Sequence, residues 1–312
     1  MARGIRRYGL ISLKGMAMGA ADVVPGVSGG TIAFISGIYQ ELIDSIRSID
    51  HKAVRTLFRQ GLPSFWKQIN GNFLLALALG IIISVVSLSK GLLWLLESYP
   101  PLVWSFFFGL IIASAIYVFS TIGKRTAGVW LMSLLGAVVA AGISLASPAQ
   151  GPEALWYVFL VGAIAICAMI LPGVSGSFLL LLMGMYEYIL GSLHELYIPV
   201  ILVFMAGAAT GLISFSHLLS WLLRRYHDLT VALLSGFMVG SLIKVWPWKV
   251  PTETLIVDGE IKVLQERHVG PSAYEALSRE PAYLWGGIGL MLFALVLIYS
   301  LERIGGKQNK LI

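Results

Sequence analysis

The pentapeptide Pro-Gly-Val-Ser-Gly occupies residues 25–29, inside an apolar stretch from 8 to 46, and recurs at residues 172–176 inside the apolar stretch 154–193. Proline lacks an N–H and fixes φ, whereas glycine permits backbone angles that other residues avoid. Each pentapeptide is therefore predicted to end one helix and begin another. The arms around the first are about 15 residues, or roughly 22 Å of helix. We interpret each stretch as a re-entrant hairpin, although the longer arms of the second also permit two short crossings.

The composition is that of a membrane protein. Hydrophobic residues make up 57% of the 312 residues and charged residues only 12%, compared with about 25% charged residues in soluble domains. Six apolar blocks are long enough to cross roughly 30 Å of hydrocarbon as helices. These predicted crossings are 72–96, 102–122, 127–146, 198–223, 229–247 and 282–301.

The distribution of basic residues predicts the orientation. The net charge is +6, and most of the 22 Lys and Arg residues fall in segments that share one side when each broken stretch returns to its own side. This asymmetry follows the positive-inside rule, so the basic residues are explained by membrane orientation and not by nucleic-acid binding. The N- and C-termini are predicted to be cytoplasmic in a multi-pass protein of the bacterial cytoplasmic (inner) membrane, with residues 247–281 outside. The fold of that segment stays open.

The two halves of the sequence are related. At an offset of 147, Gly37 matches Gly184 and Tyr39 matches Tyr186; at an offset of 127, Gly80 matches Gly207 and Trp94 matches Trp221. Each half, 1–147 and 148–312, contains one hairpin and three crossings, and an odd number of crossings inverts the second half. We predict an all-α polytopic membrane protein of two inverted-topology repeats, an architecture typical of secondary transporters. The alternative is a duplicated structural protein without a substrate path.

The hairpin tips are the predicted substrate site. A helix that begins at a tip presents N–H groups and the positive end of its dipole, which suits phosphate or carboxylate. Serine hydroxyls add donors, and small residues let the two tips approach each other closely. The predicted binding residues are Gly26, Ser28, Gly29, Gly30, Thr31, Gly173, Ser175, Gly176 and Ser177. The alternative is that these residues only cap and pack helices.

Charged residues within membrane segments are candidates for ion coupling. Asp22 precedes the first tip and has Met169 as its counterpart, so it is predicted to act once, for example on a proton or a sodium ion; the alternative is capping or pairing with Lys14. Further candidates are Glu41, Glu187, Lys90 and His217. Lys90 and His217 occupy equivalent positions and would suit a phosphate, or else snorkel and pack. Asp44, nearer the hairpin mouth, is interpreted as solvated, and Arg224 and Arg225 as topology anchors.

The sequence contains no motif for catalysis, nucleotide binding or metal binding. Its single cysteine, Cys167, lies in an apolar stretch and is interpreted as a packing residue. We therefore predict neither an enzyme nor a bound cofactor or metal. Uphill movement of a substrate would then be driven by an ion gradient or by the lipid gradient itself.

Residues 14–33, KGMAMGAADVVPGVSGGTIA, with Gly37-Ile38-Tyr39, Leu171 to Ser177 and Gly184-Met185-Tyr186, resemble the bacterial polyprenyl-phosphate transporter family, long catalogued only as a domain of unknown function. The resemblance covers nearly the whole chain. It implies a flippase that returns undecaprenyl phosphate from the outer to the inner leaflet, so that this lipid carrier is recycled for peptidoglycan synthesis in the cell envelope. The residues that carry coupling are not transferred from the family.

Three other functions compete with this expectation. One is ion-coupled uptake of a small soluble anion. Another is an intramembrane enzyme that acts on lipid phosphates, which the missing catalytic cluster disfavours. The last is a scaffold, which would transport nothing and tolerate changes at the tips.

Overall fold

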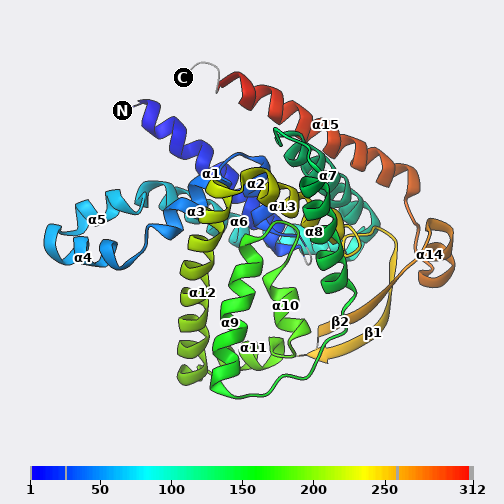
Figure 1. Cartoon of the computed structure of the whole chain (residues 1–312). Helices are drawn as coiled ribbons and strands as arrows, with labels where there is room; N and C mark the ends of the chain where they lie inside the picture. Colours follow the sequence, from blue (N-terminus) through cyan, green and yellow to red (C-terminus); the bar gives the residue numbers. More distant parts are fainter. Residues whose placement is uncertain (1, 25–26, 258–259, 309–312) are drawn as a thin grey trace.

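The computed structural model describes the backbone of residues 2–24, 27–257 and 260–308, and side chains within 7–24, 27–252 and 266–300. Fifteen helices and two strands lie in the described backbone (Figure 1). The first half contains α1 (Ala2–Val23), α2 (Gly29–Ile35), α3 (Tyr39–Arg47), α4 (His51–Gln60), α5 (Leu62–Gln68), α6 (Gly71–Ser98), α7 (Pro100–Ser120) and α8 (Ala127–Leu145).

The second half begins with a similar succession of helices. It contains α9 (Leu155–Ile170), α10 (Gly176–Leu182), α11 (Tyr186–His194), α12 (Ile198–Arg225), α13 (His227–Ser241), β1 (Lys249–Val257), β2 (Glu260–His268), α14 (Pro271–Ser278) and α15 (Leu284–Gln308). The strands pair antiparallel, with Lys249 opposite His268. The chain is thus mostly helical, as predicted, and the segment 247–281, whose fold the sequence left open, adds a β-hairpin and a short helix.

Four of the described helices are long and apolar enough to cross a membrane, namely α6, α7, α8 and α12. The pair α10 and α11 passes the same test as one segment with a bend of 108°. Large apolar side chains such as Val86 on α6, Leu134 on α8 and Leu202 on α12 are exposed, as expected of surfaces that face lipid. These features define a multi-pass helical membrane protein.

Two element boundaries differ from the sequence prediction. The incoming arm of the first hairpin is longer than expected, because α1 has 22 residues and includes the basic N-terminal segment. Conversely, the predicted crossing 229–247 is corrected to α13, which ends at Ser241. The chain turns there because Ser241 carbonyl accepts from the Lys244 amide. This turn brings Lys244 to Glu266 on β2 instead of into lipid.

Both outgoing arms are broken, which the sequence prediction did not include. The break between α2 and α3 lies at Gly37, with φ of +72°, and the break between α10 and α11 lies at Gly184, with φ of +66°. Residues that carry a side chain rarely adopt such positive φ values, whereas glycine does so readily. The matched glycines therefore let each outgoing arm change direction within the protein.

Helices pack in corresponding pairs. Within the first half α1 lies along α6, and within the second half α9 lies along α12 in the same way. Two further pairs join the halves, because α7 lies along α15 and α8 lies along α13. A Cβ added to Gly80 would overlap the carbonyl oxygen of Ser12, and one added to Gly207 would overlap that of Phe159. Glycine at these positions thus permits close helix contact in both pairs.

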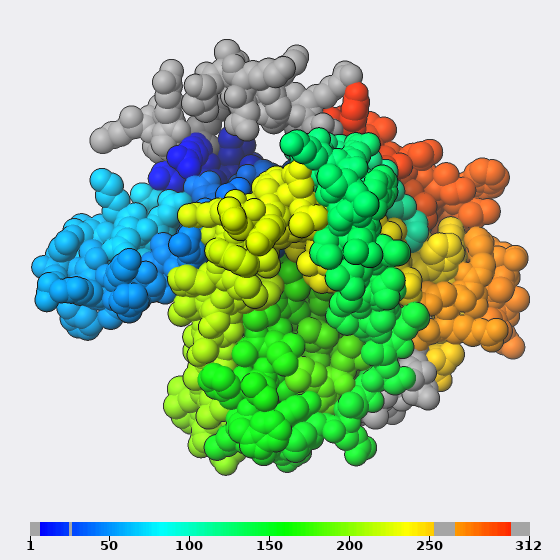
Figure 2. Space-filling model, in the orientation of Figure 1, coloured from blue at the N-terminus to red at the C-terminus, as the bar shows by residue number. Residues whose placement is uncertain are grey.

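The largest buried cluster joins both halves around α7 and α13. Its members include Val27 in the first tip, Ile111 on α7 and Met238 on α13, each at most 1% exposed. Around this core, α4 and α5 project on one side of the molecule and the segment containing α14 projects on the other (Figure 2). The two hairpin tips therefore lie at this buried core, near the centre of the packed chain.

Candidate functional site

The first tip is closed by its own residues. Asp22, in the last turn of α1, accepts a hydrogen bond from the Gly29 amide at 2.6 Å. Ser28 is the N-cap of α2 and its Oγ accepts from the Gly30 amide at 3.1 Å. These amides are therefore used inside the protein, and Asp22 serves as a cap. Gly26, a predicted binding residue, lies outside the described residues.

The two tips are in direct contact. Ser28 Oγ lies 3.1 Å from the Leu171 carbonyl oxygen, and the Gly173 amide donates to Thr31 Oγ1 at 3.1 Å. Tyr39 hydroxyl donates to the Ile170 carbonyl at 3.2 Å. Ser28 and Thr31 are almost fully buried. Residues about 140 positions apart in the chain thus form one polar centre enclosed by apolar helices.

The second tip differs from the first, because its amides are not closed by a carboxylate. Ser175 is the N-cap of α10 without a side-chain capping bond, and its Oγ lies 3.0 Å from Ser177 Oγ. Within the described residues, the amides of Gly176 and Ser177 donate no hydrogen bond. The second tip therefore retains the donors that an anionic group requires.

A small cavity adjoins the second tip. Its lining includes Gly173 and Ser175 from the tip and Phe178 from α10. Ser144, near the end of α8, and Lys244, after α13, complete its polar lining. Polar side chains from three separate segments thus line one cavity beside the second tip, and the Ser144 hydroxyl also donates to the Ala140 carbonyl of its own helix at 2.8 Å.

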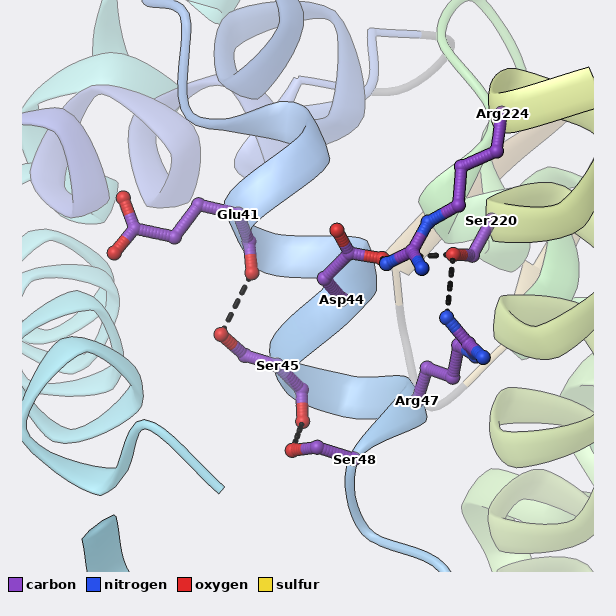
Figure 3. Close-up of polar contacts among 7 residues, drawn as sticks. All are labelled: Glu41, Asp44, Ser45, Arg47, Ser48, Ser220 and Arg224. Atoms are coloured by element: carbon purple, nitrogen blue, oxygen red, sulfur yellow. Dashed lines mark hydrogen bonds and ion pairs between the residues drawn. The ribbon is translucent and has the colours of Figure 1, made fainter. Parts of the chain in front are cut away.

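A second polar cluster joins α3 to α12 (Figure 3). Asp44 Oδ1 accepts from Ser220 Oγ at 2.7 Å and from Arg224 at 2.9 Å. Arg47 donates to Ser220 Oγ at 3.3 Å. Asp44, interpreted from the sequence as solvated, is therefore paired, and Arg224 binds it across the two halves. Only the tertiary structure shows this cluster, since no local pattern links residues so far apart.

The opposite face of α3 is tied to the first half. Glu41 points away from α12 (Figure 3) and accepts from Arg7 on α1 and from Asn70 before α6, both at 3.0 Å. Lys14 donates to the Ser36 carbonyl and does not pair with Asp22 in the structure. Glu41 thus anchors α3 and has no contact with either tip among the described residues.

The remaining charged candidates are separate from the tips. Lys90 on α6 and Glu187 on α11 are exposed, and His217 Nδ1 lies 2.9 Å from the Ile213 carbonyl of its own helix. Within the described residues, none of the three makes a hydrogen bond or ion pair with a tip. Their proposed roles in coupling would require contacts in another conformation.

This arrangement of helices and buried tips defines a multi-pass helical membrane protein with a polar centre between its halves. The chain belongs to the VCA0040-like family, described as undecaprenyl phosphate translocase-like, whose model matches residues 18–261. The family predicted from the sequence motifs is thereby confirmed.

Two relatives carry the name polyprenyl-phosphate transporter. The protein from Vibrio cholerae serotype O1 is 45% identical over 308 residues, which cover 98% of this chain and all of the relative. The protein from Staphylococcus aureus is 33% identical over 253 residues, covering 75% of this chain and 85% of the relative. No solved structure matches the chain. The names indicate a transporter and not an enzyme.

Proposed function

We propose that this protein carries undecaprenyl phosphate from the outer to the inner leaflet of the cytoplasmic membrane, where the lipid re-enters peptidoglycan synthesis. The observation that carries the proposal is the hydrogen-bonded contact between the two buried tips, with unused donors on the second tip. A phosphate group needs such a polar centre inside the membrane, while a prenyl tail stays in lipid. The names of the two relatives support the same substrate class.

We propose further that residues 1–147 and 148–312 are inverted repeats. The proposal is supported by α6 and α12, which both have 28 residues and start 127 positions apart. It is also supported by the matched contacts of Gly80 with Ser12 and of Gly207 with Phe159. The orientation follows from the basic loops, so the ends of α3 and α12 are assigned to the cytoplasmic side.

The conformation is proposed to be outward-facing. On the proposed cytoplasmic side, α3 packs on α12 through Asp44, Ser220 and Arg224. The same repeat offsets place Gly191 on α11 opposite Leu93 and Glu97 on α6, yet α11 does not pack along α6.

An open cavity occupies the corresponding place on the outer side. It is lined by Tyr188, Gly191, Ser192, Glu195 and Tyr197. Tyr188, Gly191 and Ser192 occupy repeat positions of α3 residues, Glu195 occupies that of Ser48 at the end of α3, and Tyr197 occupies that of Asn70. Transport would exchange the two arrangements, with α11 closing on α6 while α3 leaves α12.

Asp22 is proposed to contribute to coupling with a proton or a sodium ion. Its carboxylate is one of the bonds that hold the first tip closed. Protonation or ion binding at Asp22 would weaken the bond from the Gly29 amide and free that donor for the substrate. The proposed coupling therefore acts by opening the first tip.

The test is transport in vesicles that contain the purified full-length protein. Labelled undecaprenyl phosphate placed in one leaflet should reach the other with wild-type protein. Gly176→Leu should abolish this movement, because a Cβ at Gly176 already approaches the Ala165 carbonyl oxygen to 2.6 Å. Gly142→Leu is the matched control, since Gly142 has nothing within 4 Å of an added Cβ.

The same vesicles separate the lipid substrate from a soluble anion. Wild-type protein should leave inorganic phosphate outside while it moves the lipid. Uptake of phosphate without lipid movement would refute the proposed substrate. Normal lipid transport by correctly inserted Gly176→Leu would refute the proposed site.

A further inference from the structure

Two lysines lie close together in the segment between α13 and α15, and one of them, Lys244, approaches the second tip. Lys244 Nζ lies 3.1 Å from Glu266 Oε2 and 4.5 Å from the centre of the Phe178 ring on α10. The same side chain lines the cavity that contains Gly173, Ser175 and Ser144. A cation that follows the end of α13 therefore lines the same cavity as Gly173 and Ser175 of the second tip.

Lys249 already engages the carboxylate that Lys244 approaches. Its Nζ lies 3.2 Å from Glu266 Oε1 and 3.3 Å from Oε2, and it donates to the Lys244 carbonyl at 2.9 Å. It also lies 3.5 Å from the centre of the Trp104 ring on α7. The side chain of Lys249 is only 5% exposed. Lys249 is thus held by two contacts with Glu266, one with the Lys244 carbonyl and one with the Trp104 ring.

The charges of this group do not balance. Two lysines share one glutamate, so the group carries one excess positive charge when both lysines are protonated. Lys244 and Glu266 have only 16% and 17% of their side chains exposed. An excess charge with so little water is costly unless an anion accompanies it. An anion in the cavity beside Ser175 would meet Lys244, which lines the same cavity.

We propose that Lys244 binds the phosphate monoester of the substrate on the outer side of the second tip, together with Ser144 and Ser175, which line the same cavity. This inference rests on the proposed function. Lys249 is a positioning residue, because it neutralises Glu266 and leaves the charge of Lys244 for the substrate. Lys244 would thus select lipids with an anionic head group at entry.

The titration of Lys249 gives this arrangement a pH dependence. Burial lowers the pKa of Lys249 to about 8, against the opposing effect of Glu266, and Lys244 lowers it further. His268, opposite Lys249 on β2, has a pKa lowered by burial and by Lys249, so it is neutral in this range. Above pH 8, loss of the Lys249 proton leaves Lys244 to neutralise Glu266. Affinity for phosphate should then fall.

The experiment uses the full-length protein in nanodiscs and vesicles. A fluorescent polyprenyl phosphate reports Kd in nanodiscs, and leaflet exchange in vesicles reports KM and kcat. Lys244→Gln should raise Kd and KM about tenfold, the loss of one charge-assisted contact, with kcat little changed. Lys244→Arg should restore most of the affinity. Lys67→Gln, an exposed lysine on α5, is the control and should match wild type.

Lys249→Gln provides the second measurement. It should raise KM at pH 7 and remove the increase in KM that wild type shows between pH 7.5 and 9. Inorganic phosphate should compete with the lipid for wild-type protein and lose this effect in Lys244→Gln.

Unchanged Kd in a folded Lys244→Gln variant would overturn the inference. Equal loss of affinity in Lys244→Arg would do the same, because it would indicate a purely structural lysine. Wild-type protein that binds the lipid through Lys244 without moving it would instead refute the proposed function. The binding and transport measurements therefore distinguish the two failures.

Discussion

Replacement of Asp44 by asparagine should shift the protein from the proposed outward-facing state toward the proposed inward-facing state. Asp44→Asn keeps the shape of the side chain but removes the charge that binds Arg224 at 2.9 Å and Ser220 at 2.7 Å. The other contacts of α3, through Glu41 to Arg7 and Asn70, stay in place. The change thus weakens the contact between α3 and α12, which closes one side in the proposed alternation, and leaves the hairpin anchored to the first half.

The magnitude follows from the exposure of each partner. Arg224 has 53% of its side chain exposed, and exposed ion pairs contribute roughly 0.2–1 kcal/mol. Ser220 is 2% exposed, and a hydrogen bond to a charged group contributes about 1.5–3 kcal/mol, compared with about 1 for a neutral acceptor such as asparagine. The expected loss is about 1–2 kcal/mol, or roughly a 5–30-fold shift in the ratio of the two states.

Cross-linking of α11 to α6 measures this shift. Cysteines at Gly191 and Leu93, in a Cys167→Ser background, should form a disulfide only when α11 closes on α6. Asp44→Asn should raise the rate of disulfide formation roughly 5–30-fold, in proportion to the population of the inward-facing state. Asp50→Asn is the control, because Asp50 caps α4 through the Ala53 amide and does not contact α12.

An unchanged rate in Asp44→Asn would refute the assignment of the α3–α12 contact as the closed side. An equal rise in Asp50→Asn would also refute it, because any loss of carboxylate would then have the same effect.

Three further predictions concern the tips and the lysine pair. Gly30→Ala should lower the stability against heating in detergent by about 1–3 kcal/mol, because the added Cβ overlaps the Ile170 carbonyl oxygen. Gly142→Ala is the control and should not lower it. Equal melting temperatures of the two variants would contradict close contact between the tips. Thr31→Val should cost about 1–3 kcal/mol, because the buried Gly173 amide loses its acceptor, and Thr31→Ser should retain most of the stability in the same assay. The free energy of unfolding of wild type, relative to that of Lys249→Met, should rise between pH 8 and 10.5. The reason is that folding lowers the pKa of Lys249 from 10.5 to about 8, so the unfolded chain binds more protons in this range. Denaturant unfolding at both pH values measures this difference, and a decrease in it would exclude this cause.

The interruption of apolar segments made the hairpins predictable from sequence. Pro25 and Pro172 lie in segments too apolar for water, and a proline–glycine element stops a helix wherever it occurs. The breaks at Gly37 and Gly184 were missed, although the two glycines had been matched. A glycine in an apolar run indicates a turn only when its φ is known, since glycine also occurs within helices.

The use of each polar group depended on contacts across the chain. Both tips were predicted to offer the same donors, yet Asp22 accepts from the Gly29 amide of the first tip and its counterpart Met169 cannot do so at the second. Ser28 and Thr31 were predicted as substrate contacts, and the structure shows them bonded to the opposite tip. The two tips differ because Asp22 precedes the first tip and Met169 precedes the second. The effect of this difference can be seen only when the helices on both sides of each tip have been placed.

The sequence by itself determined that this chain is a multi-pass membrane protein, that its apolar stretches break at the two Pro-Gly tips and that it belongs to a transporter family, because hydropathy, backbone restriction and motif are local properties. Only the tertiary structure decided that Asp44 meets Arg224, that Lys244 reaches the second tip, and that α3 but not α11 packs on the opposite half. These contacts join residues far apart in the chain, and their free energies are of the order of a few kcal/mol. Local sequence patterns carry no signal for which of these distant contacts are formed.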